Sequence, residues 1–165
     1  MRQHEVDILG LAETNTNWRN GNIYKSILHI IRKGIQDKKA FLYTSDANIE
    51  WTTDYKQGGI AVITTSSITA QTTMKQNDHP YGRWNAITLG PMEHKVTIIT
   101  AYIVCNTHID PTKDKTAAYQ QWQLMCNEPN SNGQHPRKRA ISDLKKFLQQ
   151  EIEMGHEVIL LIDLN

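Results

Sequence analysis

The sequence predicts a mixed α/β layer structure with an antiparallel meander at its centre, and three observations lead to it. Short runs rich in β-branched residues alternate with turn signals through most of the chain. Three other segments repeat apolar residues at spacings of three and four, which indicates amphipathic helices. The last of these helices leads directly into an apolar run, a helix-to-strand unit in which the helix covers one face of a sheet. A doubly wound parallel sheet fits less well, because strands follow one another in the middle of the chain.

Seven segments are predicted to be strands. They are residues 6–12, 40–44, 59–65, 67–73, 84–89, 96–104 and 158–162. Gly90-Pro91 interrupts the chain between the fifth and the sixth, so we expect these two to form a hairpin. The seventh contains no polar residue and is expected to be a strand buried on both faces.

Three segments are predicted to be helices. The first carries an apolar stripe and stops near Gly34, and the second covers residues 117–126. The third begins after Pro136, ends before Gly155 and has the clearest stripe, formed by Ile141, Leu144, Phe147, Leu148 and Ile152.

The composition describes a chain that can bury a core of its own. With 165 residues and 39% hydrophobic content, residues 1–165 are expected to belong to a single domain. The 18 basic and 17 acidic residues give a net charge of +1, which argues neither for nor against a nucleic-acid partner. No run approaches the roughly 20 apolar residues that span a bilayer. Two cysteines make no disulfide framework, so we expect an intracellular protein, cytoplasmic or nuclear.

Acidic residues end two of the apolar runs. Asp163 follows residues 158–162, with Asn165 two positions further on, and Glu13 follows residues 6–12. Residues two apart in a strand point to the same face, so Asp163 and Asn165 are expected to reach one reacting group. Two acids at strand ends can converge on a divalent cation. The residues alone leave open that Asp163 and Asn165 cap a strand entering a turn, and that Glu13 is a solvated loop acid.

Five short motifs resemble, in order, those of the endonuclease/exonuclease/phosphatase superfamily, which has the deoxyribonuclease I-like fold. They are Asp7-Ile-Leu-Gly-Leu-Ala-Glu-Thr-Asn15, Gly58-Gly-Ile-Ala-Val62, Gly82-Arg83, Ile98-Ile-Thr-Ala-Tyr102 and Leu161-Ile-Asp-Leu-Asn165. The segments Tyr119-Gln-Gln-Trp122 and Pro136-Arg-Lys-Arg139 look like those of non-LTR retroelement nuclease domains. The resemblance implies a two-sheet α/β sandwich, with mixed and largely antiparallel sheets flanked by helices, that hydrolyses phosphodiesters with Mg²⁺ or Mn²⁺.

Each role is implied by the resemblance only where the residues match. Glu13 is similar to the metal-binding glutamate, and Tyr102 to the tyrosine that hydrogen-bonds the scissile phosphate. Asp163 resembles the aspartate that orients or deprotonates the attacking water, and Asn165 the amide that holds the phosphate region. Arg83 is expected either to bind a substrate phosphate or to form an ion pair in a turn. The cluster Arg137-Lys-Arg139 is expected either to touch DNA backbone or to form a solvated face.

The resemblance also implies what the chain belongs to. We expect part of a DNA endonuclease domain of a retroelement, with DNA as partner, a reverse transcriptase domain in the full-length protein and no association with membranes. Ile162 and Leu164 stand where the family usually has glycine and an aromatic residue. The family's opening asparagine strand and its final aspartate and histidine have no match here, so we expect an incomplete domain with little or no nuclease activity alone. A phosphatase acting on a lipid or nucleotide phosphate and a degenerate non-catalytic remnant remain alternatives.

Overall fold

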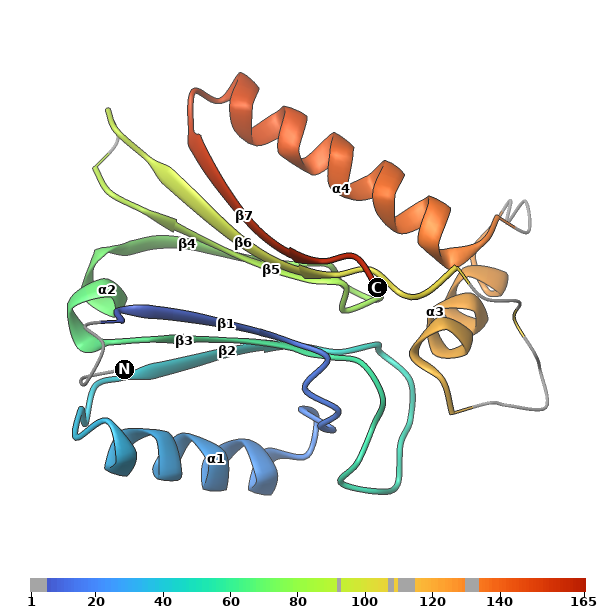
Figure 1. The fold of residues 1–165 in the computed structure, drawn as a ribbon, viewed down its shortest axis with the longest axis horizontal. Coiled ribbons are helices and arrows are strands. Elements are labelled where there is room, and N and C mark those ends of the chain that lie inside the picture. The colour runs from blue at the N-terminus through green and yellow to red at the C-terminus, as the bar shows by residue number, and fades with distance from the viewer. Residues whose placement is uncertain (1–5, 92, 107–108, 110–114, 130–133) are drawn as a thin grey trace.

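A computed structural model describes residues 6–91, 93–106, 109, 115–129 and 134–165 of the chain. Seven strands and four helices follow one another in these parts (Figure 1). They are β1 (Ile8–Ala12), α1 (Gly21–Gly34), β2 (Phe41–Ser45), β3 (Ile60–Thr64), α2 (Ser66–Gln71), β4 (Thr72–Asn77), β5 (Trp84–Leu89), β6 (Val96–Tyr102), α3 (Ala117–Cys126), α4 (Pro136–Glu153) and β7 (Glu157–Asp163).

The strands form two sheets that pack face to face. One sheet has the order β1-β3-β2 and is antiparallel throughout. The other has the order β4-β5-β6-β7, in which only the β6–β7 pair is parallel. Helix α1 covers the outer face of the first sheet and α4 the outer face of the second (Figure 1). The predicted fold class, a two-sheet α/β sandwich flanked by helices, is confirmed, as is the hairpin of β5 and β6.

Successive side chains of a strand point to opposite faces of its sheet, so they divide between the layer that joins the two sheets and the layer beneath a helix. In β3, Val62 packs between the sheets, whereas its neighbours Ala61 and Ile63 pack against α1. In β6, Ile98 packs between the sheets and Ile99 lies in the cluster beneath α4. Both strands are therefore apolar on two faces, which explains why they read as continuous apolar runs in the sequence.

The sheets approach each other closely where β1 crosses β6. A Cβ atom added to Gly10 would lie 2.4 Å from the hydroxyl oxygen of Thr100, so only glycine fits here without displacement. Thr100 is buried, and its Oγ1 has no hydrogen-bond partner among the described residues.

The prediction of a strand over residues 67–73 is wrong for most of its length. Residues 66–71 form helix α2, and β4 begins only at Thr72. The Thr65 hydroxyl hydrogen-bonds with that of Ser67 (2.9 Å), and the Thr69 hydroxyl donates to the carbonyl of Thr65 (2.8 Å). Such local side-chain bonds offer the backbone an alternative to a sheet, which β-branched content alone does not reveal.

The expectation that the last apolar run is buried on both faces is also wrong. Strand β7 is the edge of its sheet, and Ile159 and Leu161 are 49% and 42% exposed on its inner face. On the other face, Val158 and Leu160 pack beneath α4. The edge strand β1 of the other sheet makes its closest approach at Thr100 of β6, next to β7 in the sheet.

None of the helices in the described parts of the chain is both long enough and apolar enough to cross a membrane.

Candidate functional site

Three of the predicted site residues meet at one end of the sandwich, where strands of both sheets end. Glu13 follows β1 directly, Tyr102 is the last residue of β6, and Asp163 is the last residue of β7. Tyr102 and Asp163 are register partners in the parallel β6–β7 pair. The Tyr102 hydroxyl hydrogen-bonds with the Glu13 side chain. The fold thus brings a phenol near two carboxylates that are far apart in the sequence.

The surroundings of Tyr102 keep its hydroxyl protonated. Burial raises the pKa of Tyr102 well above its ordinary value of 10.0, and the negative charge of Glu13 raises it further. Cys105 and Asp163 act in the same direction. The side chain is 5% exposed. At neutral pH, Tyr102 is therefore a fixed, uncharged hydrogen-bond donor facing two acids.

Glu13 stands on a backbone that is held in an unusual conformation. Its φ is +50° and that of Asn15 is +52°, both in the left-handed region that residues other than glycine seldom adopt. Two backbone hydrogen bonds hold this segment against the glycines that precede β3. Thr14 N donates to Gly59 O (3.1 Å), and Asn15 N donates to Gly58 O (2.8 Å). The Asn15 side chain accepts in return from Gly58 N (3.1 Å). These bonds fix an exposed carboxylate in place, an arrangement typical of functional sites.

The glycine pair before β3 is required by this packing. A Cβ on Gly58 would lie 3.0 Å from the Ala117 side chain and 4.0 Å from the Tyr102 ring, and φ is +86°. A Cβ on Gly59 would lie 2.9 Å from the Thr14 hydroxyl. The motif therefore brings the Glu13 segment and α3 close to Tyr102.

Asp163 and Asn165 are related by a turn and not by a strand. Strand β7 ends at Asp163. The Asn165 N–H donates to the Asp163 Oδ1 (3.1 Å), and the φ of Asn165 is +30°. The alternative that the sequence left open, a capped strand end, describes this geometry. The expectation that period two puts both side chains on one face is wrong here, because Asn165 lies beyond the strand. Asp163 itself is anchored through its carbonyl, which accepts from Ile103 N (2.9 Å).

Arg137 holds the ends of β6 and β7 together. Its Nη1 donates to the carbonyls of Val104 (2.8 Å), Leu164 (2.6 Å) and Asn165 (2.9 Å). Arg139 pairs with Asp143 at 2.8 Å and with Glu128 at 3.5 Å. The basic cluster at the start of α4 thus contributes mainly to structure, a role for Arg137 that its sequence position gave no sign of.

Arg83 forms the ion pair that the sequence left open as the alternative to phosphate binding. Its guanidinium pairs with Asp78, and its Nη2 lies 3.0 Å from Asp143 of α4. The guanidinium carbon also lies 4.3 Å from the Tyr81 ring centroid and 4.9 Å from that of Trp84. Arg83 is 1% exposed and cannot meet a substrate in this arrangement. It locks α4 onto the start of β5.

Glu13 is the residue that would hold a divalent cation, with Asp163 as a second acid near Tyr102. No group of three or more His, Cys, Asp or Glu side chains in the described parts of the chain is arranged to hold a metal. Mg²⁺ commonly uses only one or two carboxylates and completes its octahedron with waters and substrate phosphate oxygens. An exposed glutamate beside a second carboxylate fits that mode of binding, and it does not fit a closed structural site.

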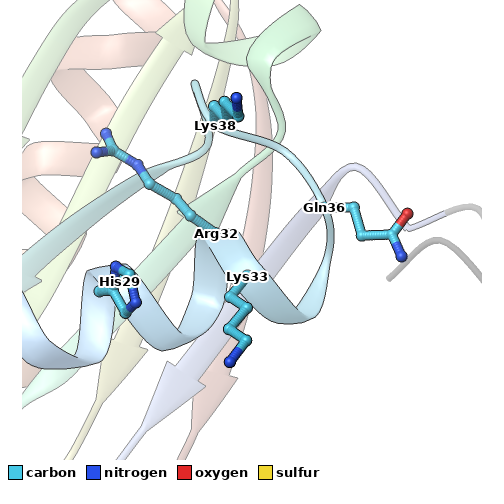
Figure 2. Close-up of a pocket in the computed structure, with 5 residues that line it drawn as sticks. All are labelled: His29, Arg32, Lys33, Gln36 and Lys38. Carbon is cyan, nitrogen blue, oxygen red and sulfur yellow. The ribbon is translucent and has the colours of Figure 1, made fainter.

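A hollow at the C-terminal end of α1 has no acidic side chain in its lining to hold a cation. It measures ≈480 Å³ and is lined by His29, Arg32, Lys33, Gln36 and Lys38. Figure 2 shows these side chains pointing away from one another, and Arg32 Nε donates to the carbonyl of Ala40 (2.9 Å). Basic residues in a last helical turn also stabilise the helix dipole. We therefore place the candidate site at the strand ends.

No model of a known protein family matches the chain, and no curated protein matches it significantly. The family resemblance of the motifs accordingly stays an expectation.

Proposed function

We propose that the chain forms part of a divalent-metal-dependent phosphodiesterase, most specifically a DNA endonuclease domain of a retroelement. One observation carries the proposal: Tyr102 lies near the carboxylates of both Glu13 and Asp163, where strands of both sheets end. A phosphodiester is an anion and repels a hydroxide nucleophile. A cation bound by an acid, together with a neutral hydrogen-bond donor, would offset that charge, and a second acid could activate the water.

Each side chain has a distinct part in the proposed reaction. Glu13, exposed at the rim, would hold Mg²⁺ or Mn²⁺, which when bound acts as a Lewis acid on the phosphate. Tyr102 keeps its proton and donates a hydrogen bond to a non-bridging phosphate oxygen. Asp163 orients the attacking water and takes its proton. Asn165 belongs to the proposal through its side-chain amide, which would hold the phosphate region beside Asp163.

The identity of the substrate and of the larger protein rests on the motif resemblance. DNA as substrate and a reverse transcriptase domain in the full-length protein both belong to this proposal. Cys105 and Cys126 are exposed free thiols, which suits a reducing, intracellular setting, either cytoplasmic or nuclear. Arg83 is left out of the proposed phosphate-binding set because it is buried in ion pairs.

Nicking of supercoiled plasmid tests the proposal, using the longest protein that the gene encodes. We expect nicking that requires Mg²⁺ or Mn²⁺ and falls at least a hundredfold in Glu13→Gln and in Asp163→Asn. Glu157→Gln is the matched control, because Glu157 is an exposed acid at the opposite end of β7. Equal nicking by all four proteins would remove these residues from the site. A folded protein that neither binds metal nor nicks would instead match the non-catalytic remnant.

A further inference from the structure

A second hollow lies beside the segment that carries Glu13, and the proposed reaction does not use it. It measures ≈450 Å³ and lies between the start of α1 and the loop after β2. The residues that matter in its lining are Asn17, Arg19, Asn20, Glu50 and Trp51. An aromatic ring, a cation and amide groups in one hollow form a set that recognises a nucleotide.

The lining of the hollow is held together by hydrogen bonds and is close in sequence to Glu13. Asn17 Nδ2 donates to the carbonyls of Trp51 (3.3 Å) and Thr53 (3.0 Å). Thr16 forms an isolated β-bridge with Tyr55. Four peptide steps separate Asn17 from Glu13, which limits their Cα atoms to about 14 Å apart. A base in the hollow would therefore lie within a few nucleotides of the reacting phosphate.

Trp51 is held as a half-buried platform. Its indole nitrogen donates to the Tyr55 carbonyl (2.7 Å) and to the Thr53 hydroxyl (3.1 Å), so the ring cannot turn freely. With its one polar atom satisfied, the ring offers only its apolar surface to a ligand. Stacking on such a ring tolerates every base, because each base has a π-face.

Two further polar side chains line the hollow. Arg19 is exposed and its charge acts on the nearby Asp46 carboxylate, but its side chain makes no hydrogen bond or ion pair with the described residues. Asn17 is 5% exposed, and its Oδ1 has no hydrogen-bond partner in the described parts of the chain. This oxygen is enclosed by protein and is not open to a ligand, whereas a backbone phosphate is an acceptor suited to the exposed Arg19.

The charges decide which part of the nucleotide enters. Glu50 lines the hollow and repels a phosphate placed inside it. Arg19 also lines an adjoining hollow of ≈200 Å³, together with Asp46, whose carboxylate is paired with Lys56, and so stands at the boundary between the two hollows. The base therefore belongs in the larger hollow and the phosphate at Arg19. A base paired within a duplex is not free to enter, so the nucleotide must be unpaired.

We propose that this hollow is a subsite for an unpaired nucleotide of single-stranded DNA, stacked on Trp51 with its phosphate at Arg19. The inference rests on the proposed function, because it deepens the choice of substrate. It assigns to this surface the recognition of single-stranded DNA next to the cleaved bond.

Binding of a fluorescein-labelled oligo(dA) tests the subsite, measured by anisotropy with the 165-residue chain in EDTA. We expect Trp51→Ala to weaken binding by about 5- to 100-fold, the effect of one stacked base. Trp51→Phe should retain most of the affinity, and Arg19→Gln should weaken binding severalfold and flatten its salt dependence. Trp122→Ala is the matched control, since Trp122 stacks on Tyr119 of α3 away from the hollow.

The outcomes separate this inference from the proposed function. Undetectable binding by the wild-type chain, equal affinity of wild type and Trp51→Ala, or an equal loss in Trp122→Ala would each overturn the subsite. If Trp51→Ala does not fold by circular dichroism, Arg19→Gln decides the question, because Arg19 is exposed and its side chain makes no hydrogen bond or ion pair with the described residues. If nicking depends on Glu13 as expected but Trp51→Ala binds the oligonucleotide as tightly as wild type, the subsite is rejected and the proposed function is not. Selective loss of binding in Trp51→Ala without any metal-dependent nicking would reject the hydrolase alone.

Discussion

Replacing Gly10 by alanine should force the two sheets apart at their closest approach. The new Cβ would lie 2.4 Å from Thr100 Oγ1 and 3.0 Å from Thr100 Cγ2, whereas ordinary contacts begin at 3.4 Å. The clash thus requires a displacement of about 1 Å between β1 and β6, in a buried layer that resists it. Overpacking of this kind costs about 1–3 kcal/mol, which lowers the melting temperature by roughly 2–12 °C in a domain of this size.

Urea unfolding followed by far-ultraviolet circular dichroism measures this loss. Gly34→Ala is the matched control, because its Cβ would meet nothing within 4 Å, and it should be neutral or slightly stabilising. Adding Thr100→Ala to Gly10→Ala removes the two closest atoms and should restore part of the lost stability. The Thr100 hydroxyl has no hydrogen-bond partner among the described residues, so its removal leaves none behind. An unchanged stability in Gly10→Ala, or no recovery in the double variant, would refute the reasoning.

Two further predictions concern buried polar groups. Arg83→Met should lower the free energy of unfolding by about 3–5 kcal/mol, because Asp78 and Asp143 then lose their shared cation; Lys138→Met, at an exposed position, should change it by less than about 0.5 kcal/mol. A loss below about 1 kcal/mol in Arg83→Met would contradict the buried ion pair. The folded-state pKa of Tyr102 lies above its ordinary value of 10.0, so its contribution to stability is complete below pH 10 and is lost as the pH rises through the folded value. Urea midpoints measured across alkaline pH should therefore fall less steeply in Tyr102→Phe than in wild type, and identical slopes would contradict the assigned environment.

The strands that form the centre of the sandwich could be predicted from sequence because their environment matches their composition. Strands β3 and β6 are apolar on both faces and lie between a helix and the other sheet. The last run, residues 158–162, has the same composition but lies at a sheet edge. An apolar composition shows that burial of a strand is favourable. The position of the strand in the sheet decides whether both of its faces are buried. That order depends on long-range pairing, which local pattern does not determine.

The same distinction separates the site residues. Glu13, Tyr102 and Asp163 could be proposed because each one ends an apolar run, and strand ends gather at the edges of sheets. Arg83 and Arg137 could not be assigned from sequence, because their partners lie on other elements. Arg83 pairs with an acid of α4, and Arg137 binds the carbonyls that follow β6 and β7. From sequence alone, an arginine at a turn or at the start of a helix is expected to lie on the surface, and only the tertiary structure shows its partners.

Binding of Mn²⁺ to the 165-residue chain, followed by the loss of the free-ion signal in electron paramagnetic resonance, tests the central claim most directly. The site at Glu13, Tyr102 and Asp163 predicts saturable binding that Mg²⁺ displaces. Glu13→Gln should weaken it by at least about tenfold, since loss of even an outer-shell partner commonly costs that much. Binding that is equal in wild type, Glu13→Gln and the control Glu157→Gln would show that these strand ends do not hold the metal.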